Sequence, residues 1–182
     1  MLPPIPSWDG LHPIIVHFPI ALLLIAPVLI VLGLIFKKSG KAFMVSAFVL
    51  MLVGTIAAFV AVATGEAAGE LAERMPNVEA VLENHEELAE MTRNIFTALT
   101  AVFGAILFVP MFFKKELDRK IMIPVGLAFL LFYGAGTVVL MNAAHEGGRL
   151  VHEFGVRAMM TNGANPNAAP VQQKVETDDD DR

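Results

Sequence analysis

Five histidines are the side chains in this sequence best suited to bind a metal ion or a haem group. They are His12, His17, His85, His145 and His152. Neutral imidazole nitrogens are common ligands of transition metals and of haem iron. Cysteine is absent, which excludes disulfides, zinc fingers, iron–sulfur clusters, covalently attached haem and a cysteine nucleophile. The chemistry open to the chain therefore depends on which histidines its fold brings together.

Each kind of site makes a different demand on the fold. Ligation of haem b by two imidazoles needs histidines on facing helices at matching depth, with small residues beside the macrocycle. A compact metal site combines histidines with carboxylates, as in zinc sites and in two-histidine, one-carboxylate iron sites. The sequence contains no Glu-x-x-His pair, which is the signature of ferritin-like di-iron proteins, and no P-loop or dinucleotide-binding motif. Enzymatic activity is left open.

The composition is that of an integral membrane protein. Hydrophobic residues make up 55% of the 182 residues and charged residues only 17%, with a mean hydropathy of +0.63. Soluble domains average about 25% charged residues. Four uncharged runs are long enough to cross the hydrocarbon layer as helices: Leu11–Phe36, Ala42–Gly65, Asn94–Phe113 and Ile121–His145. The sequence therefore predicts an all-α fold, a four-helix transmembrane bundle of two antiparallel hairpins.

The connections between these runs differ in length and charge. Lys37–Lys41 and Lys114–Lys120 are short, whereas Glu66–Arg93 is long, acidic and helix-forming, so we expect it to extend the second and third helices to a turn near Met75–Val78. The two short loops hold seven of the thirteen basic residues, which by the positive-inside rule places them in the cytoplasm and both termini outside. We expect a multi-pass protein of the inner (plasma) membrane, N-out and C-out.

The remaining charges lie on the opposite, extracytoplasmic side. Sixteen of the eighteen acidic residues fall there, which argues against nucleic acid as a partner. The last residues of the chain are polar and acidic, ending in the run Asp178–Asp181. We therefore expect one four-helix transmembrane domain over residues 1–157 and a disordered tail over residues 158–182.

This topology places all five histidines at the outer end of the bundle. On a regular helix His12 and His17 lie about 7–8 Å apart along the axis and point about 140° apart, which argues against chelation of one small ion by both. His17, His85 and His145 come from three helices at one level, and we expect them to be the haem ligands, with His17 and His85 preferred. A metal ion would use His12, His17, His85 or His145 together with Glu66.

Small residues accompany the histidines at this end. Gly65-x-x-x-Gly69 ends the second helix, and Gly147-Gly148 follows the fourth. Such residues let transmembrane helices pack closely, and they also leave room for a flat ligand. The pair Gly147-Gly148 argues against continuation of the fourth helix from His145 to His152.

Several segments resemble a known family of bacterial membrane proteins. Leu11-His-Pro-Ile-Ile-Val-His-Phe-Pro-Ile-Ala21 is similar to the opening of the DUF2231 family, whose first helix begins His-Pro-x-x-Val-His-Phe-Pro. Ala63–Gly69, His85 and Gly147–Val156 also resemble the family, and the likeness covers residues 10–157. The resemblance implies a four-helix membrane architecture. Some members are joined to c-type cytochrome modules, which implies an association with electron transfer.

Together these features predict a haem- or metal-binding membrane subunit linked to electron transfer, with its site at the extracytoplasmic end of the bundle. Haem b is the expected cofactor, and a transition-metal ion or no cofactor is the alternative. The expected partners are the lipid bilayer, a quinone and an extracytoplasmic redox protein, in a homo- or hetero-oligomer.

Two other functions were weighed against electron transfer. The first is a structural or interaction subunit of a membrane complex, because histidines at membrane interfaces are often only hydrogen-bonded or snorkelling residues. The second is a small transporter, which is disfavoured because transporter sites lie near the bilayer midplane and no charged residue lies there in this chain.

Overall fold

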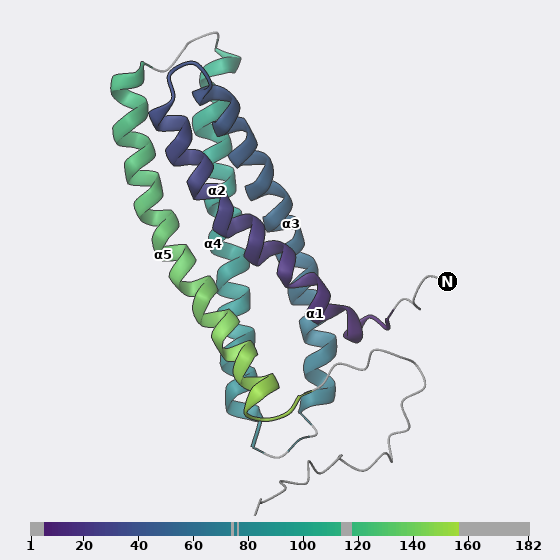
Figure 1. Ribbon diagram of the computed structural model, residues 1–182. Coiled ribbons are helices and arrows are strands. Elements are labelled where there is room, and N and C mark those ends of the chain that lie inside the picture. Colours follow the sequence, from purple (N-terminus) through teal and green to yellow (C-terminus); the bar gives the residue numbers. More distant parts are fainter. Residues whose placement is uncertain (1–5, 74, 76, 114–117, 157–182) are drawn as a thin grey trace, which may run out of the picture.

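Long apolar runs fold into helices that lie side by side in the computed structural model, which describes residues 6–73, 75, 77–113 and 118–156 (Figure 1). A short 3₁₀ helix η1 (Asp9–Leu11) and the one-turn α1 (His12–Ile15) lead into α2 (His17–Ile35). They are followed by α3 (Gly40–Ala72), α4 (Glu79–Phe112) and α5 (Arg119–His152). The described part of the chain contains no strand. The prediction of an all-α fold is confirmed.

Four helical segments are long and apolar enough to cross a membrane, η1 to α2 counting as one of them. α2 and α3 form one hairpin and α4 and α5 the other, and contacts between α3 and α4 and between α2 and α5 join the two hairpins (Figure 1). The α3–α4 turn and α1 lie at one end of the bundle, and the α2–α3 turn lies at the other. The predicted pair of antiparallel hairpins is therefore present.

Three of the helices extend beyond the runs that predict them. α3 continues to Ala72 and α4 begins at Glu79, as the helix-forming connection predicts, and the turn between them includes Asn77 with a φ of 63°. α5 continues through Gly147 and Gly148 to its end at residue 152, contrary to the expectation from the glycine pair. A glycine costs a helix only about 1 kcal/mol, which packing against a neighbouring helix can offset.

The centre of the bundle is filled by apolar side chains from every long helix. Leu23, Met51, Phe96 and Tyr133 are almost completely buried there. Tyr133 also donates a hydrogen bond of 2.6 Å to the backbone carbonyl of Leu23. That carbonyl has no helical partner because the residue four positions later is Pro27, which lacks an N–H. The tyrosine therefore satisfies a buried group that the proline leaves without its usual donor.

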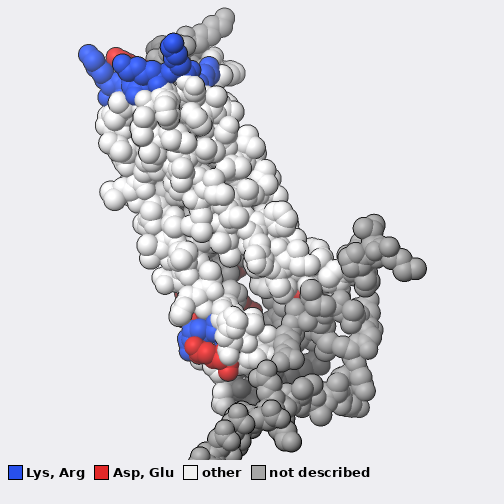
Figure 2. Space-filling view, viewed as in Figure 1, with Lys and Arg blue, Asp and Glu red and all other residues white. Residues whose placement is uncertain are grey.

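The surface is divided into an apolar band and two charged ends. Large exposed hydrophobic side chains, among them Ile25, Phe59, Leu131 and Phe132, lie on the middle of the bundle. Basic side chains gather at the end that holds the α2–α3 turn and the start of α5 (Figure 2). This arrangement is the one a lipid-embedded bundle requires. The predicted tail over residues 158–182 lies outside the described residues.

Candidate functional site

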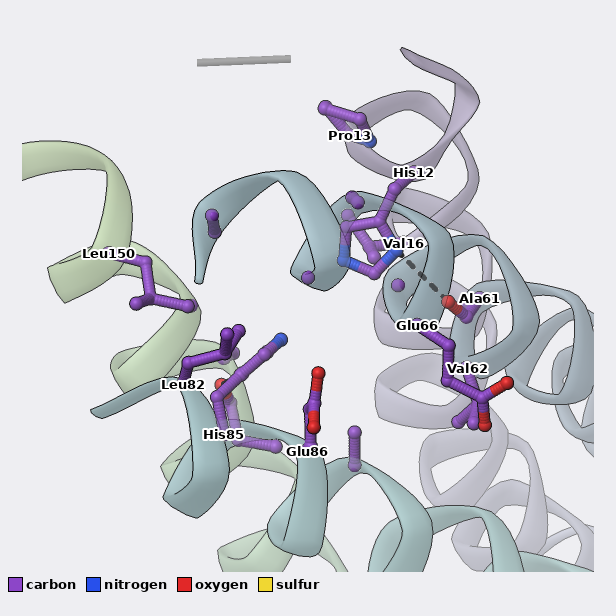
Figure 3. A pocket seen from close by; sticks show the side chains of 18 of the residues that line it. His12, Pro13, Val16, Ala61, Val62, Glu66, Leu82, His85, Glu86 and Leu150 are labelled. Atoms are coloured by element: carbon purple, nitrogen blue, oxygen red, sulfur yellow. Dashed lines mark hydrogen bonds between the residues drawn. The ribbon is translucent and has the colours of Figure 1, made fainter. Parts of the chain in front are cut away.

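A cavity of about 880 Å³ lies at the end of the bundle opposite the basic turn (Figure 3). Its walls come from η1 and all five α-helices, and they are mainly apolar, with side chains such as Val16, Val62, Leu82 and Leu140. Three histidines also line it: His12, His17 and His85. Cavities of a few hundred to about 1,000 Å³ with apolar walls and few polar groups are typical of small-molecule and cofactor sites.

His12 is held against α3. Its Nδ1 lies 2.9 Å from the backbone carbonyl oxygen of Ala61 and 3.3 Å from Oγ1 of Thr64. A carbonyl oxygen can only accept, so Nδ1 carries the proton and Nε2 of the neutral ring is left with its lone pair. The ring fits because residue 65 is glycine: a Cβ there would lie 2.9 Å from Cε1 of His12.

His85 is held against α5 in the same way. Its Nδ1 donates to the carbonyl oxygen of Ala143 over 2.9 Å, which again leaves Nε2 with a lone pair. A Cβ on Gly147 would lie 2.9 Å from Cε1 of this ring. In each hairpin a histidine from the first helical segment therefore donates to the carbonyl of an alanine on the second, with a glycine four residues after that alanine.

The two rings enter the cavity from opposite hairpins, each with a ring nitrogen directed into the space between them (Figure 3). Their centres are 6.3 Å apart, and their planes are 82° apart. Neither Nε2 makes a hydrogen bond within the described residues. The arrangement therefore presents two imidazole lone pairs to one region of the cavity.

The cavity is rich in carboxylates. Six acidic residues line it: Asp9, Glu66, Glu83, Glu86, Glu87 and Glu90. Glu86 lies against α3, since its Oε1 occupies the space over Gly69 where a Cβ would stand. The described lining residues include no lysine or arginine. The electrostatic potential of the cavity is therefore negative, which favours cationic ligands and the more positively charged state of any redox centre.

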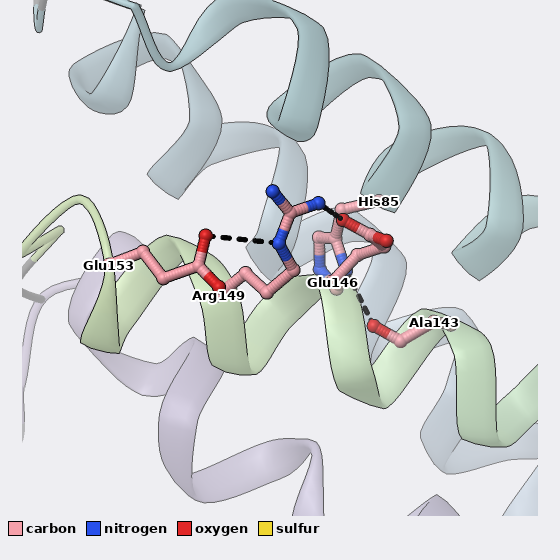
Figure 4. Close-up of polar contacts among 5 residues, drawn as sticks. All are labelled: His85, Ala143, Glu146, Arg149 and Glu153. Atoms are coloured by element: carbon pink, nitrogen blue, oxygen red, sulfur yellow. Dashed lines mark hydrogen bonds and ion pairs between the residues drawn. The ribbon is translucent and has the colours of Figure 1, made fainter.

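An ion-pair cluster at the end of α5 lies next to His85, which is on α4 (Figure 4). Arg149 donates to Glu146 over 2.9 Å and to Glu153 over 3.1 Å. The side chain of Glu146 is only 14% exposed, whereas Glu153 is 54% exposed. Glu146 thus brings a largely buried carboxylate next to His85.

The chain was compared with known families, curated proteins and solved structures. Residues 9–159 match the model of the DUF2231 family, which is described as a predicted membrane protein. The chain belongs to the DUF2231 family. None of the curated proteins and none of the solved structures matches it. The family match confirms the resemblance found in the sequence and the membrane character of the protein.

The other candidate residues of this DUF2231 protein occupy different surroundings. His17 is exposed at the edge of the cavity, and Glu66 is exposed and lines it. His145 and His152 are exposed and do not line the cavity. No group of three or more histidine and acidic side chains is close enough to hold a metal ion within the described ranges.

Sequence reasoning did not identify the backbone acceptors that hold the two rings. The signal is visible as a repeated spacing: Ala61-x-x-x-Gly65 in the second helix and Ala143-x-x-x-Gly147 in the fourth. Within a helix, residues four apart lie on one face, so the glycine opens the surface directly beside the alanine carbonyl. Only the packing of the hairpins shows that a histidine fills each opening.

Proposed function

We propose that this DUF2231 protein is a membrane electron-transfer subunit that binds haem b between His12 and His85. The observation that carries the proposal is the pair of neutral imidazoles whose ring centres are 6.3 Å apart, each with Nδ1 hydrogen-bonded and the other ring nitrogen directed into the cavity (Figure 3). Haem bound there would supply one-electron redox chemistry. His12 thus takes the place of His17, which the sequence favours, because the ring of His12 is the one held inside the cavity.

The spacing of the rings is one at which both could hold a single metal centre. With metal–nitrogen bonds of about 2.0–2.1 Å, and with the centre of each ring about 1.1 Å beyond its nitrogen, two such rings have centres about 6.2–6.4 Å apart. Hydrogen bonds from Nδ1 to a backbone carbonyl fix the tautomer and orientation of histidine ligands in metal sites. The cavity volume leaves space for a large ligand between the two hairpins.

The proposal includes the orientation of the bundle in the membrane. The basic end, with the α2–α3 turn, faces the cytoplasm of an inner-membrane protein, so the cavity lies at the extracytoplasmic end with both termini outside. A quinone in the bilayer and a basic extracytoplasmic redox protein are the electron-exchange partners that fit this position. Charge complementarity supports the second partner, because acidic residues predominate around the cavity.

The visible spectrum of the purified protein tests the proposal. We expect a Soret band and, after reduction with dithionite, a sharp α band. Both should be lost in His12→Ala and in His85→Ala, and both should persist in the matched variants His17→Ala and His145→Ala, which remove exposed rings. Loss of the bands in His17→Ala with retention in His12→Ala would instead support the ligand pair favoured by the sequence.

A transition-metal ion is a second candidate, favoured by the negative charge of the cavity. A cation that prefers two nitrogen ligands could lie between His12 and His85. Elemental analysis of protein purified without added metal separates the two: bound metal without a Soret band supports this candidate. Colourless, metal-free protein from haem-replete cells would overturn both and favour a structural or interaction subunit.

A further inference from the structure

The two histidine sites are built alike except at one position. Thr64 is three residues after Ala61, and Glu146 is three residues after Ala143, so they occupy the same place relative to the carbonyl that holds each ring. On the His12 side this position carries a neutral hydroxyl, 3.3 Å from Nδ1. On the His85 side it carries a carboxylate, that of Glu146, which lies next to the ring (Figure 4). The two imidazoles therefore differ in the charge beside them.

The charge beside His85 is controlled by Arg149. The guanidinium donates to the Glu146 carboxylate over 2.9 Å (Figure 4). The Glu146 side chain is 14% exposed and that of Arg149 is 33% exposed, so water screens this interaction in part. Arg149 also donates a hydrogen bond from Nε to the exposed Glu153. The pair thus places a partly neutralised negative charge beside one of the two proposed haem ligands.

We propose that Glu146 and Arg149 are positioning residues that set the reduction potential of the haem through His85. This inference rests on the proposed function. A negative charge beside a histidine ligand stabilises the ferric state, because that state carries one more positive charge than the ferrous state. A positive charge on Arg149 acts in the opposite direction. The same position on the His12 side, Thr64, is neutral and lacks this effect.

Redox titration of the purified haem protein tests the pair. Glu146→Gln keeps the size of the side chain and removes its charge, and we expect the equilibrium constant for reduction to rise roughly ten-fold, which is 59 mV for a one-electron couple. Arg149→Gln should change the potential in the opposite direction, because the carboxylate is then uncompensated. In the Glu146→Gln background, Arg149→Gln should have a smaller effect than it has alone.

One variant serves as the control. Glu70→Gln removes an exposed carboxylate on α3 that does not line the cavity, and it should leave the potential close to that of the wild type. A loss of packing alone would not shift the potential in opposite directions in the two variants of the pair.

The outcomes separate this inference from the proposed function. If the wild-type protein binds no haem, the proposed function is overturned and this inference with it. If haem is bound but Glu146→Gln leaves the potential unchanged or lowers it, only the role of Glu146 is overturned. A potential that rises in Arg149→Gln would overturn the role of Arg149.

Discussion

At the scale of single residues, two glycines decide whether the rings of His12 and His85 fit against their neighbouring helices. In Gly65→Ala or Gly147→Ala the new Cβ would lie 2.9 Å from the ring carbon Cε1, so the ring must move off its carbonyl acceptor. We expect retention of haem to fall roughly 10- to 100-fold, as for other losses of outer-shell support. Gly148→Ala is the matched control, because a Cβ there meets no atom within 4 Å. Haem content per protein, measured by absorbance, distinguishes these variants, and equal retention in all three would contradict this account.

The relative orientation of the two rings gives a spectroscopic prediction. Their planes are 82° apart. If His12 and His85 held one haem iron with their rings in this orientation, the oxidised haem would give a strongly anisotropic low-spin EPR signal. We expect that signal from the oxidised protein at low temperature. A rhombic spectrum with three well-separated features of moderate anisotropy would show that the rings are close to parallel in the bound state.

Sequence patterns could identify the histidines as the chemical groups but not their pairing. The depth estimated from a regular helix favours His17 over His12. In the structure Val16, between α1 and α2, keeps helical backbone angles, and the ring of His12 reaches a carbonyl on α3, 49 positions along the chain. A backbone acceptor leaves no residue-type signal of its own. Only a weak cue, the two Ala-x-x-x-Gly spacings, was available in the sequence.

At the scale of helices, Tyr133 and Pro27 are expected to be energetically coupled. Tyr133→Phe leaves the buried carbonyl of Leu23 without a donor, which should lower the free energy of unfolding by about 1–2 kcal/mol. In a Pro27→Ala background the new N–H of residue 27 can donate to that carbonyl, so Tyr133→Phe should cost less. Thermal denaturation in detergent measures the stability of the wild type, the two single variants and the double variant. Equal costs in both backgrounds would show that the hydrogen bond between α5 and α2 is not the source of the effect.

The helices themselves were largely predictable because the membrane constrains them so strongly. A spanning segment must satisfy its backbone polar groups internally, so an uncharged run of sufficient length leaves few alternatives to a helix. The turn between α3 and α4 was predictable from Pro76 and Asn77, which interrupt helix-forming sequence. The continuation of α5 through Gly147 was not, since the ring of His85 that occupies the space beside that glycine comes from another hairpin.

At the scale of the whole molecule, the orientation in the membrane can be tested by labelling. The chain contains no cysteine, so single cysteines report one position each. Ser39 and Ala80 are both exposed, at opposite ends of the bundle. With the basic end in the cytoplasm, Ala80→Cys should react with a membrane-impermeant maleimide in intact cells, and Ser39→Cys should react only after the membrane is permeabilised. The reverse pattern would invert the proposed topology.

The position of the cavity at one end of the bundle limits the proposed electron-transfer function. A hydrocarbon layer is about 30 Å thick, and a protein that carries electrons across it unaided needs redox centres at more than one depth. His12 and His85 form one pair. The remaining histidines lie at the same end of the bundle as this pair. If the pair holds a haem and the basic end faces the cytoplasm, as proposed, that haem would exchange electrons with partners in or above the extracytoplasmic half of the membrane.

This one-sided arrangement predicts the response to a reductant on either side of the membrane. In liposomes, protein oriented with its cavity outward should be reduced promptly by an impermeant reductant added outside. The same reductant trapped inside should reduce the haem only slowly, because the electrons must cross the apolar length of the bundle. Adding a lipid-soluble quinone should restore rapid reduction from inside, since the quinol diffuses through the bilayer. Prompt reduction from the trapped reductant alone would contradict a site confined to one end.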